Sequence, residues 1–136
     1  MTLTVEDRIA VTDLIHGYGH LVDAGELDRL EELFTPDVTY DLADFGQGTL
    51  TGVAAIRSAA LALGDANPVG HHVTNVVLAE QADGQVRARS KGIGVMADGT
   101  TGSVVYDDVI VRDGTSWRIR HRKIAARRAP LGGVPR

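Results

Sequence analysis

The sequence predicts an α+β fold, in which three N-terminal helices cover one face of a strongly curved, mixed or antiparallel sheet. The first half of the chain is dominated by helical periodicity. From residue 70 to 126, β-rich segments are separated by three short turns that are rich in Asp and Gly. Helices followed by such a meander are typical of α+β domains. We therefore expect a cone-shaped pocket between the helices and the sheet.

Three helices are expected in the first half of the chain. Thr4 can cap a helix over 5–22, whose apolar residues recur at spacings of three and four. A second short helix follows over 23–34, where Asp23 stands three residues before Glu26 as in a capping box. Thr51 can cap a third helix that ends at Gly64.

Five strands are expected, a first one over 38–42 and a meander over 71–81, 86–97, 103–111 and 117–126. Glycines inside the later strands suit a strongly curved sheet. In the last strand, simple alternation puts Arg118, Arg120 and Arg122 on one face, which we interpret as a solvent-exposed outer surface.

With 136 residues, the chain is expected to be one domain over 1–136, with a flexible tail at 127–136. The net charge of −4, and the absence of aromatic residues between the basic ones, argue against nucleic-acid binding. No apolar run approaches the ~20 residues of a membrane helix. There is no cysteine, which fits a cytoplasmic protein.

Two adjacent histidines open the most β-prone segment, GHHVTN. Strand alternation sends them to opposite faces, so that His71 aligns with Val73 and Asn75 while His72 aligns with Thr74. Alternation does not say which face is inward. A histidine at the start of a strand is more often inert than catalytic, unless a partner orients it.

Several other polar residues have both a structural and a functional interpretation. Asp23 either caps the second helix or orients an imidazole. Tyr18 and Tyr40 are either core residues or phenols that polarise a carbonyl group. Of Asp107 and the next residue, Asp108, one must point inward, where a carboxylate needs a cation beside it. His121 shares a face with Trp117 and is inward if that face is core. The histidines and aspartates show no recognisable metal-ligand spacing.

The combination of YGHLVDAGELDRLEELFTPDVTY, GVAAIR, HHVTN and DGTSWRIRHRKI resembles the nuclear transport factor 2-like superfamily, and in particular its SnoaL-like bacterial members. The resemblance to scytalone dehydratase and hexachlorocyclohexane dehydrochlorinase implies that Asp23 and His71 form a His–Asp dyad, with the histidine four residues before Asn75. It also implies a water-binding role for Tyr40. A resemblance to ketosteroid isomerase implies an oxyanion hole at Tyr18 and Asp107, while Leu42 stands where that enzyme has its base.

The resulting prediction is a cofactor-independent lyase, such as a dehydratase, or an isomerase, with no metal. A non-catalytic ligand-binding or assembly domain is the alternative. The resemblance also implies a homodimer. A small apolar substrate is expected, including cyclic molecules such as polyketides or steroids. The predicted catalytic residues are His71, Asp23, Tyr18 and Tyr40, and the predicted substrate-binding residues are Asp107, Trp117, Phe45, Asn75 and His121.

Overall fold

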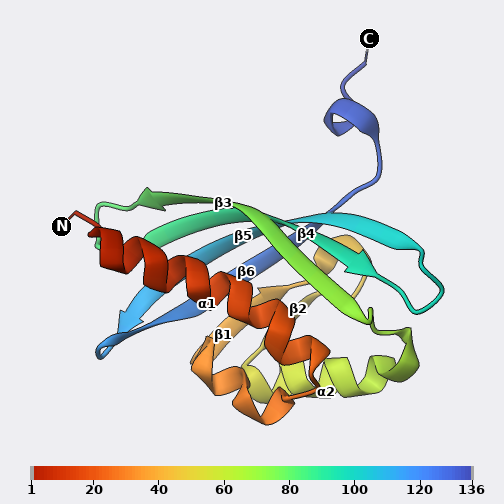
Figure 1. The fold of residues 1–136 in the computed structure, drawn as a ribbon, viewed down its shortest axis with the longest axis horizontal. Helices are drawn as coiled ribbons and strands as arrows, with labels where there is room; N and C mark the ends of the chain where they lie inside the picture. Colours follow the sequence, from red (N-terminus) through yellow and green to blue (C-terminus); the bar gives the residue numbers. More distant parts are fainter. Residues whose placement is uncertain (1, 136) are drawn as a thin grey trace.

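A six-stranded mixed sheet curves around two α-helices in the computed structural model, which describes residues 2–135 (Figure 1). The strand order is β2-β1-β6-β5-β4-β3. The strands are β1 Phe34–Asp41, β2 Thr49–Thr51, β3 Gly70–Glu80, β4 Val86–Val95, β5 Thr101–Asp113 and β6 Ser116–Arg127. The helices are α1 Val5–Asp23 and α2 Val53–Leu63, with short 3-10 segments η1 Leu27–Glu32, η2 Ala43–Phe45, η3 Gly64–Ala66 and η4 Pro130–Gly133. The predicted α+β class with a curved sheet is confirmed.

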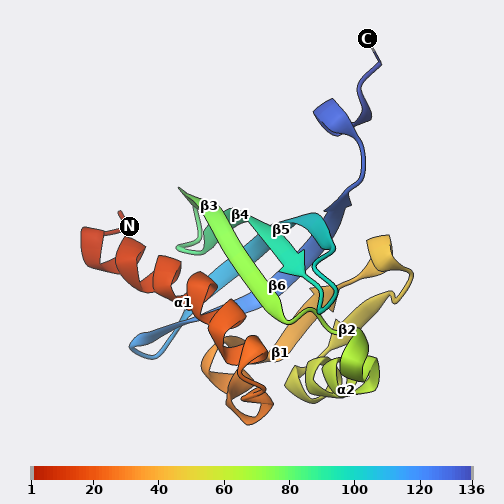
Figure 2. The ribbon, with the colours of Figure 1, turned by 45° about the vertical axis from the view of Figure 1, so that its right-hand side comes forward.

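Both helices lie on one side of the sheet, as Figure 2 shows. Helix α1 runs beside β3, and α2 lies below β1 and β2. The core fills the space between these layers and is built around side chains that are at most 1% exposed. They include Val11, Ile15, Leu30, Phe34, Val38, Ile110 and Ile119.

Helix α1 begins with the predicted cap. The Thr4 hydroxyl accepts a hydrogen bond from the Asp7 backbone N–H, and the Asp7 carboxylate accepts one from the Thr4 backbone N–H, both at 3.0 Å. Two of the unpaired donors of the first turn are therefore satisfied reciprocally.

Helix α1 ends in a Schellman motif. The backbone N–H of Glu26 donates to the Leu21 carbonyl at 3.1 Å, and that of Gly25 donates to the Val22 carbonyl at 3.0 Å. Gly25 has a φ of 70°, the left-handed conformation that this motif requires. Backbone groups thus close the helix without Asp23, and its carboxylate is free for another partner.

Three local expectations in the first half of the chain are wrong. The second helix is only the 3-10 segment η1. The five expected strands do not include the short strand β2, which follows η2. Thr51 belongs to β2, where it pairs with Thr39 of β1. Gly52, with a φ of 87°, is therefore the N-cap residue of α2 in place of Thr51.

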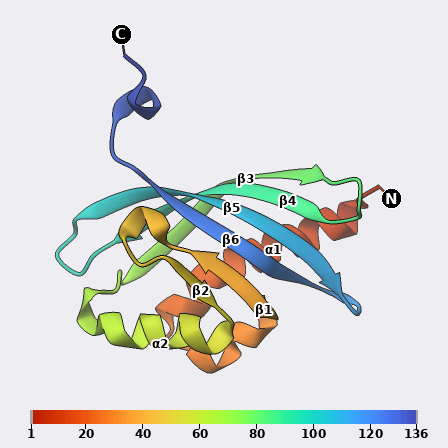
Figure 3. The same cartoon turned by 180° about the vertical axis from the view of Figure 1, so that it is seen from behind.

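The sheet is mixed because β1 pairs with β6 in parallel, while all its other pairings are antiparallel (Figure 3). The four strands of the predicted meander follow one another as expected. The parallel pairing places β1 beside the last strand, β6, so that Tyr40 lies opposite Arg122.

Two bulges break the strand alternation. In β3, Asn75 adopts a φ of 57° where the register with β4 shifts, so that Val76 and Leu78 turn inward after it. In β6, Arg120 is the extra residue opposite the step from Val109 to Ile110 in β5. A one-residue shift moves every later side chain to the other face. Each bulge therefore changes which residues reach the concave face.

The bulge in β6 overturns our interpretation of its arginines. Arg122 lies on the concave face and is fully buried, whereas Arg120 is exposed. His121, expected to be inward with Trp117, instead lies on the other face from Arg122 and is only half-buried.

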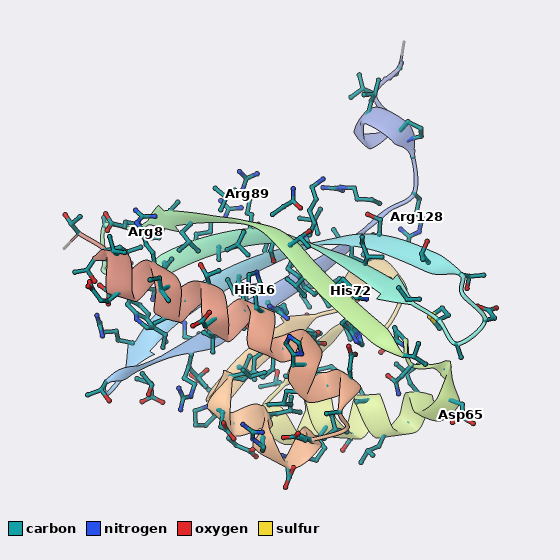
Figure 4. All side chains as sticks on the ribbon, in the orientation of Figure 1. Arg8, His16, Asp65, His72, Arg89 and Arg128 are labelled. Atoms are coloured by element: carbon teal, nitrogen blue, oxygen red, sulfur yellow. The ribbon has the colours of Figure 1, made fainter. Side chains whose placement is uncertain are left out.

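The chain leaves the body of the domain after β6, and residues 128–135 extend away from it (Figures 1 and 3). Every side chain in this segment is exposed. Figure 4 shows Arg128 at the point where the segment departs, and the Arg128 guanidinium contacts the Asp44 carboxylate at 3.4 Å.

Within the described part of the chain, no helix is long and apolar enough to cross a membrane.

Candidate functional site

A cavity of about 310 Å³ lies between the two helices and the concave face of the sheet. Most of its lining is aliphatic or aromatic, and His71 is its only ionisable nitrogen base among the described residues. No Lys, Arg, Asp or Glu within residues 2–135 lines it. A larger groove of about 580 Å³ lies between α1, η1 and Trp117, but its lining mixes apolar side chains with Asp, Glu and Arg, and it does not reach His71. The lining of the smaller cavity is Tyr18, Val22, Leu27, Leu30, Tyr40, Leu42, Phe45, Gln47, Leu50, Ile56, Ala59, Ala60, Leu63, Asn67, Pro68, His71, Gly94, Met96, Gly102, Val104, Tyr106 and Ile124.

Asp23 and His71 are in direct contact at the wall of this cavity. The distance from Asp23 Oδ1 to His71 Nδ1 is 2.6 Å, and Asp23 Oδ2 accepts the His71 backbone N–H at 2.9 Å. The two side chains are only 26% and 15% exposed, so solvent screens their interaction weakly. The alternative in which Asp23 caps the following turn is not seen, because the N–H groups of residues 25 and 26 bond to α1 carbonyls.

The position of Asp23 is electrostatically unusual. It is the last residue of α1, at the negative end of the helix dipole, where an acidic side chain is disfavoured. The two hydrogen bonds from His71 compensate for this position.

Gly19 permits the close approach of α1 and β3 that brings this pair together. A Cβ atom on Gly19 would lie 2.5 Å from the His71 carbonyl oxygen, closer than real Cβ contacts occur. The absence of a side chain at residue 19 therefore sets the spacing between the helix that carries Asp23 and the strand that carries His71.

Two tyrosines form a hydrogen-bonded pair beside the histidine. The hydroxyl groups of Tyr18 and Tyr40 are 2.9 Å apart, and both residues are buried. The Tyr18 ring meets the His71 ring edge to face, with centroids 5.9 Å apart. Burial and the neighbouring Tyr18 raise the pKa of Tyr40, so Tyr40 stays protonated as a donor. The phenols therefore provide hydroxyl groups at the same wall as the imidazole.

A buried ion pair lies behind these rings. The Arg122 guanidinium donates two hydrogen bonds to the Asp108 carboxylate, at 2.8 and 3.0 Å, and neither side chain is exposed. The Arg122 Cζ atom lies 4.6 Å from the centroid of the Tyr18 ring and 4.4 Å from the centroid of the Tyr106 ring. Burial lowers the pKa of Arg122, but the Asp108 carboxylate and the nearby phenols Tyr40 and Tyr106 raise it. The net shift of the pKa is upward, so the guanidinium is charged. Arg122 Nη1 has no protein partner in the described chain.

Of the five predicted substrate-binding residues, the structure places only Phe45 at the cavity, where it is 42% exposed. Asp107 faces outward and forms an ion pair with Arg87 at 2.6 Å. Its neighbour Asp108 is the inward carboxylate, because the two occupy successive strand positions. The isomerase-like role expected for Asp107 therefore has no geometric support.

The other three expected residues also lie away from the cavity. Trp117 is buried under the Arg112 guanidinium at the opposite end of the sheet, 4.5 Å from ring centroid to Cζ. Asn75 occupies the β3 bulge. His121 has its Nδ1 2.6 Å from the Thr39 hydroxyl. His72 is exposed on the face of β3 opposite to His71.

Sequence reasoning did not include Tyr106, Asp108 or Arg122 among the site residues. The signal for Tyr106 was its position two residues before Asp108, on the same face of the predicted strand. The sequence required one of Asp107 and Asp108 to point inward beside a cation, but it did not decide between them or identify the cation. Arg122 itself was hidden by the bulge at Arg120, which has no signature in the sequence.

No cluster of three or more metal-ligating side chains occurs in the part of the chain that the structure describes.

The fold and the cavity define a small α+β domain whose curved sheet and helices enclose a pocket. The chain belongs to the SnoaL-like domain family, whose model matches residues 3–123. This confirms the resemblance seen in the sequence motifs. No curated protein matches the chain significantly.

Solved structures with the same fold include three of interest. One, from Novosphingobium aromaticivorans, is provisionally named an aromatic ring hydroxylase; it is 27% identical, with a TM-score of 0.75 and 94% of each chain covered. A provisionally named scytalone dehydratase from the same organism is 18% identical, with a TM-score of 0.76, covering 91% of this chain and 86% of that one. LinA is 22% identical, with a TM-score of 0.72, covering 96% of this chain and 92% of its own. The last two likenesses concern the fold alone.

Proposed function

We propose that this domain is a cofactor-independent lyase or isomerase that uses His71 and Asp23 as an acid–base dyad in an apolar pocket. The observation that carries the proposal is the double contact of Asp23 with His71, at the ring and at the backbone. Histidine is the side chain best suited to taking and returning a proton near neutral pH.

The contact with Asp23 leaves His71 Nε2 as the nitrogen that can react. A carboxylate accepts hydrogen bonds only, so the ring proton stays on Nδ1 and Nε2 carries the lone pair. Asp23 also stabilises the imidazolium that forms once Nε2 takes a proton. Because His71 lines the cavity, a bound molecule can present an acidic C–H bond to this nitrogen.

Tyr18 is the residue proposed to stabilise the negative charge that develops during proton removal. When the Tyr40 hydroxyl is the donor of its hydrogen bond with Tyr18, the Tyr18 hydroxyl can donate its own hydrogen bond to a substrate oxygen. His71 removes a proton from the carbon next to a carbonyl group, and the electron pair moves to the carbonyl oxygen. The enolate then follows one of two courses. It expels a halide ion, or a hydroxyl group that leaves as water with the proton returned by the His71 imidazolium, from the next carbon; or it takes that proton back at another carbon.

A ligand-binding domain without catalysis is the competing proposal, and the apolar cavity supports it equally. The two proposals differ in what happens to a bound molecule. The test is a panel of uncharged cyclic β-hydroxy ketones and β,γ-unsaturated ketones, with binding and product formation both measured. Turnover by wild type and His72→Ala, with loss of roughly 10²–10⁴-fold in His71→Ala, supports the enzyme. Binding without turnover, or turnover that survives in His71→Ala, contradicts it.

A homodimer through the outer face of the sheet is also proposed. This face presents exposed apolar side chains that include Val77 and Ile93, which are 55% and 44% exposed. It also carries Arg89, which in Figure 4 stands on the side of the sheet away from the helices. Sedimentation of wild type as a dimer and of Ile93→Glu as a monomer is the expected result. A monomeric wild type would contradict the proposal.

A further inference from the structure

Tyr106 is a cavity residue with an unused hydroxyl group. It lies on β5, is 4% exposed and lines the cavity together with Tyr18 and His71. Its hydroxyl makes no hydrogen bond to another residue in 2–135, and it is not one of the polar atoms sealed in the core. A buried phenol normally finds a hydrogen-bond partner. The missing partner is therefore expected to be a molecule in the cavity.

The Tyr106 ring is held firmly in place. It packs on the bare backbone of Gly92, where a Cβ atom would lie 2.5 Å from Tyr106 Cε2. Its other neighbours include the Arg122 guanidinium, at 4.4 Å, and the Tyr18 ring, with centroids 6.1 Å apart. Both rings thus contact one buried cation, which is itself fixed by Asp108. Such support fixes the direction in which a hydroxyl group can donate.

We propose that Tyr106 donates a hydrogen bond to the ligand of this cavity, and that this ligand is an uncharged molecule whose oxygen is held between Tyr106 and Tyr18. Burial raises the pKa of Tyr106, so its hydroxyl remains a donor across the physiological range. The inference rests on the proposed function in taking this cavity as the substrate site. It does not depend on proton transfer by His71.

The restriction to uncharged ligands follows from the cavity wall. None of its described lining residues is Lys or Arg. Arg122, which contacts the lining rings of Tyr18 and Tyr106, is already neutralised by Asp108. Asp23 lies directly behind His71 and would repel an anion. A carboxylate or phosphate would lose its hydration without gaining a counter-ion. A ketone or a phenol needs only the donors that the tyrosines provide.

The test uses 2-naphthol, an uncharged bicyclic phenol, with binding followed by its fluorescence. Tyr106→Phe is expected to weaken binding about three- to tenfold, the effect of losing one hydrogen bond. Naphthalene, which has no oxygen, should bind wild type and Tyr106→Phe equally. The anion of 2-naphthoic acid should bind wild type at least about tenfold more weakly than 2-naphthol. Ser90→Ala is the matched control, because Ser90 faces Tyr106 across the β4–β5 ladder, is buried, and does not line the cavity.

Equal binding of 2-naphthol to wild type and Tyr106→Phe overturns the inference, as does failure of wild type to bind 2-naphthol. A thermal melt checks that the variant is folded. A second measurement needs no variant, because the chain has three tyrosines and therefore three ¹³Cζ-tyrosine resonances. The Tyr106 resonance should shift more on addition of 2-naphthol than of naphthalene, which can act on it only through its ring current. Equal shifts, or no shift with 2-naphthol, contradict the inference. This readout is binding and not turnover, so a failure of the acid–base proposal, measured with the ketone panel, is recognised separately.

Discussion

The carboxylate of Asp23 accepts two hydrogen bonds from a single residue, His71, one from ring Nδ1 at 2.6 Å and one from the backbone N–H at 2.9 Å. The backbone bond fixes where the strand begins relative to the end of α1, and the ring bond fixes the tautomer. One carboxylate thus sets both the position and the protonation pattern of the imidazole.

Asp23→Asn should remove most of the activity although it preserves the size of the side chain. The His71 backbone N–H can only donate, so it will keep the amide oxygen of the new Asn. The amide NH₂ then donates to ring Nδ1, so the ring proton moves to Nε2. Nε2 no longer has a free lone pair with which to accept a proton from the substrate. We expect a loss in kcat of roughly 10²–10⁴-fold, as for removal of a general base. The ¹⁵N chemical shifts of the His71 ring report the tautomer, and an unchanged tautomer in the variant would contradict the explanation.

Gly19→Ala should separate α1 from β3. Its Cβ would meet the His71 carbonyl oxygen at 2.5 Å, and neither backbone can yield easily. We expect a loss of about 1–3 kcal/mol in the free energy of unfolding, measured by urea denaturation, and weakened activity. Gly17→Ala is the control on the same helix, because its Cβ would lie 3.8 Å from Leu33 Cδ2, an ordinary contact. It should gain up to about 1 kcal/mol from helix propensity. Equal effects of the two substitutions would contradict the close-approach argument.

Asp108→Asn and Asp107→Asn should differ sharply although the residues are adjacent. Removing the Asp108 charge leaves Arg122 buried and unpaired, which costs about 3–5 kcal/mol of stability. The Asp107–Arg87 pair is 35% and 53% exposed, so Asp107→Asn should cost at most about 1 kcal/mol. Chemical denaturation of both variants decides this. Similar losses would mean that the inward and outward assignments of the two aspartates are reversed.

Stability should fall in alkaline solution because of the two tyrosines with raised pKa values. Burial raises the pKa of Tyr40 and of Tyr106, so the folded state holds these protons more tightly than the unfolded chain. Their contribution is fully present below the unfolded pKa of about 10 and is lost as pH rises from there toward the folded values. The free energy of unfolding should decline above about pH 10, by up to about 1.4 kcal/mol per pH unit for each tyrosine. Tyr106→Phe should show a shallower decline, and an identical slope would contradict the assignment.

The elements that the sequence predicted well depend on local signals. The capping box of Thr4 and Asp7 and the turns of the meander are encoded within a few neighbouring residues. The contact between Asp23 and His71 was anticipated only through the family resemblance, because 48 residues separate them along the chain. The local sequence pattern alone favoured a capping role for Asp23.

The errors arise where long-range pairing decides the conformation. A bulge at Arg120 exchanges the inward and outward positions of the rest of β6, which buries Arg122. Thr51 pairs with Thr39 in the sheet and therefore does not cap a helix. The positive φ of Asn75 has a weak local signal, since asparagine tolerates the left-handed region better than most residues. Of the residues wrongly expected in the cavity, His121 follows the bulge at Arg120 and Asn75 lies at the bulge in β3. Trp117 lies at the far end of the sheet, and Asp107 is the outward member of two adjacent aspartates between which alternation could not decide.

Deuterium exchange into a bound ketone tests the central claim, that His71 moves a proton on carbon, more directly than turnover. Uncharged cyclic ketones are incubated in D₂O with wild type, His71→Ala, Asp23→Asn and His72→Ala, and isotope incorporation next to the carbonyl is followed by NMR. His72→Ala is the control, since His72 lies on the opposite face of β3. We predict exchange by wild type and His72→Ala, with a loss of roughly 10²-fold or more in the other two variants. Exchange that persists in His71→Ala would contradict the account.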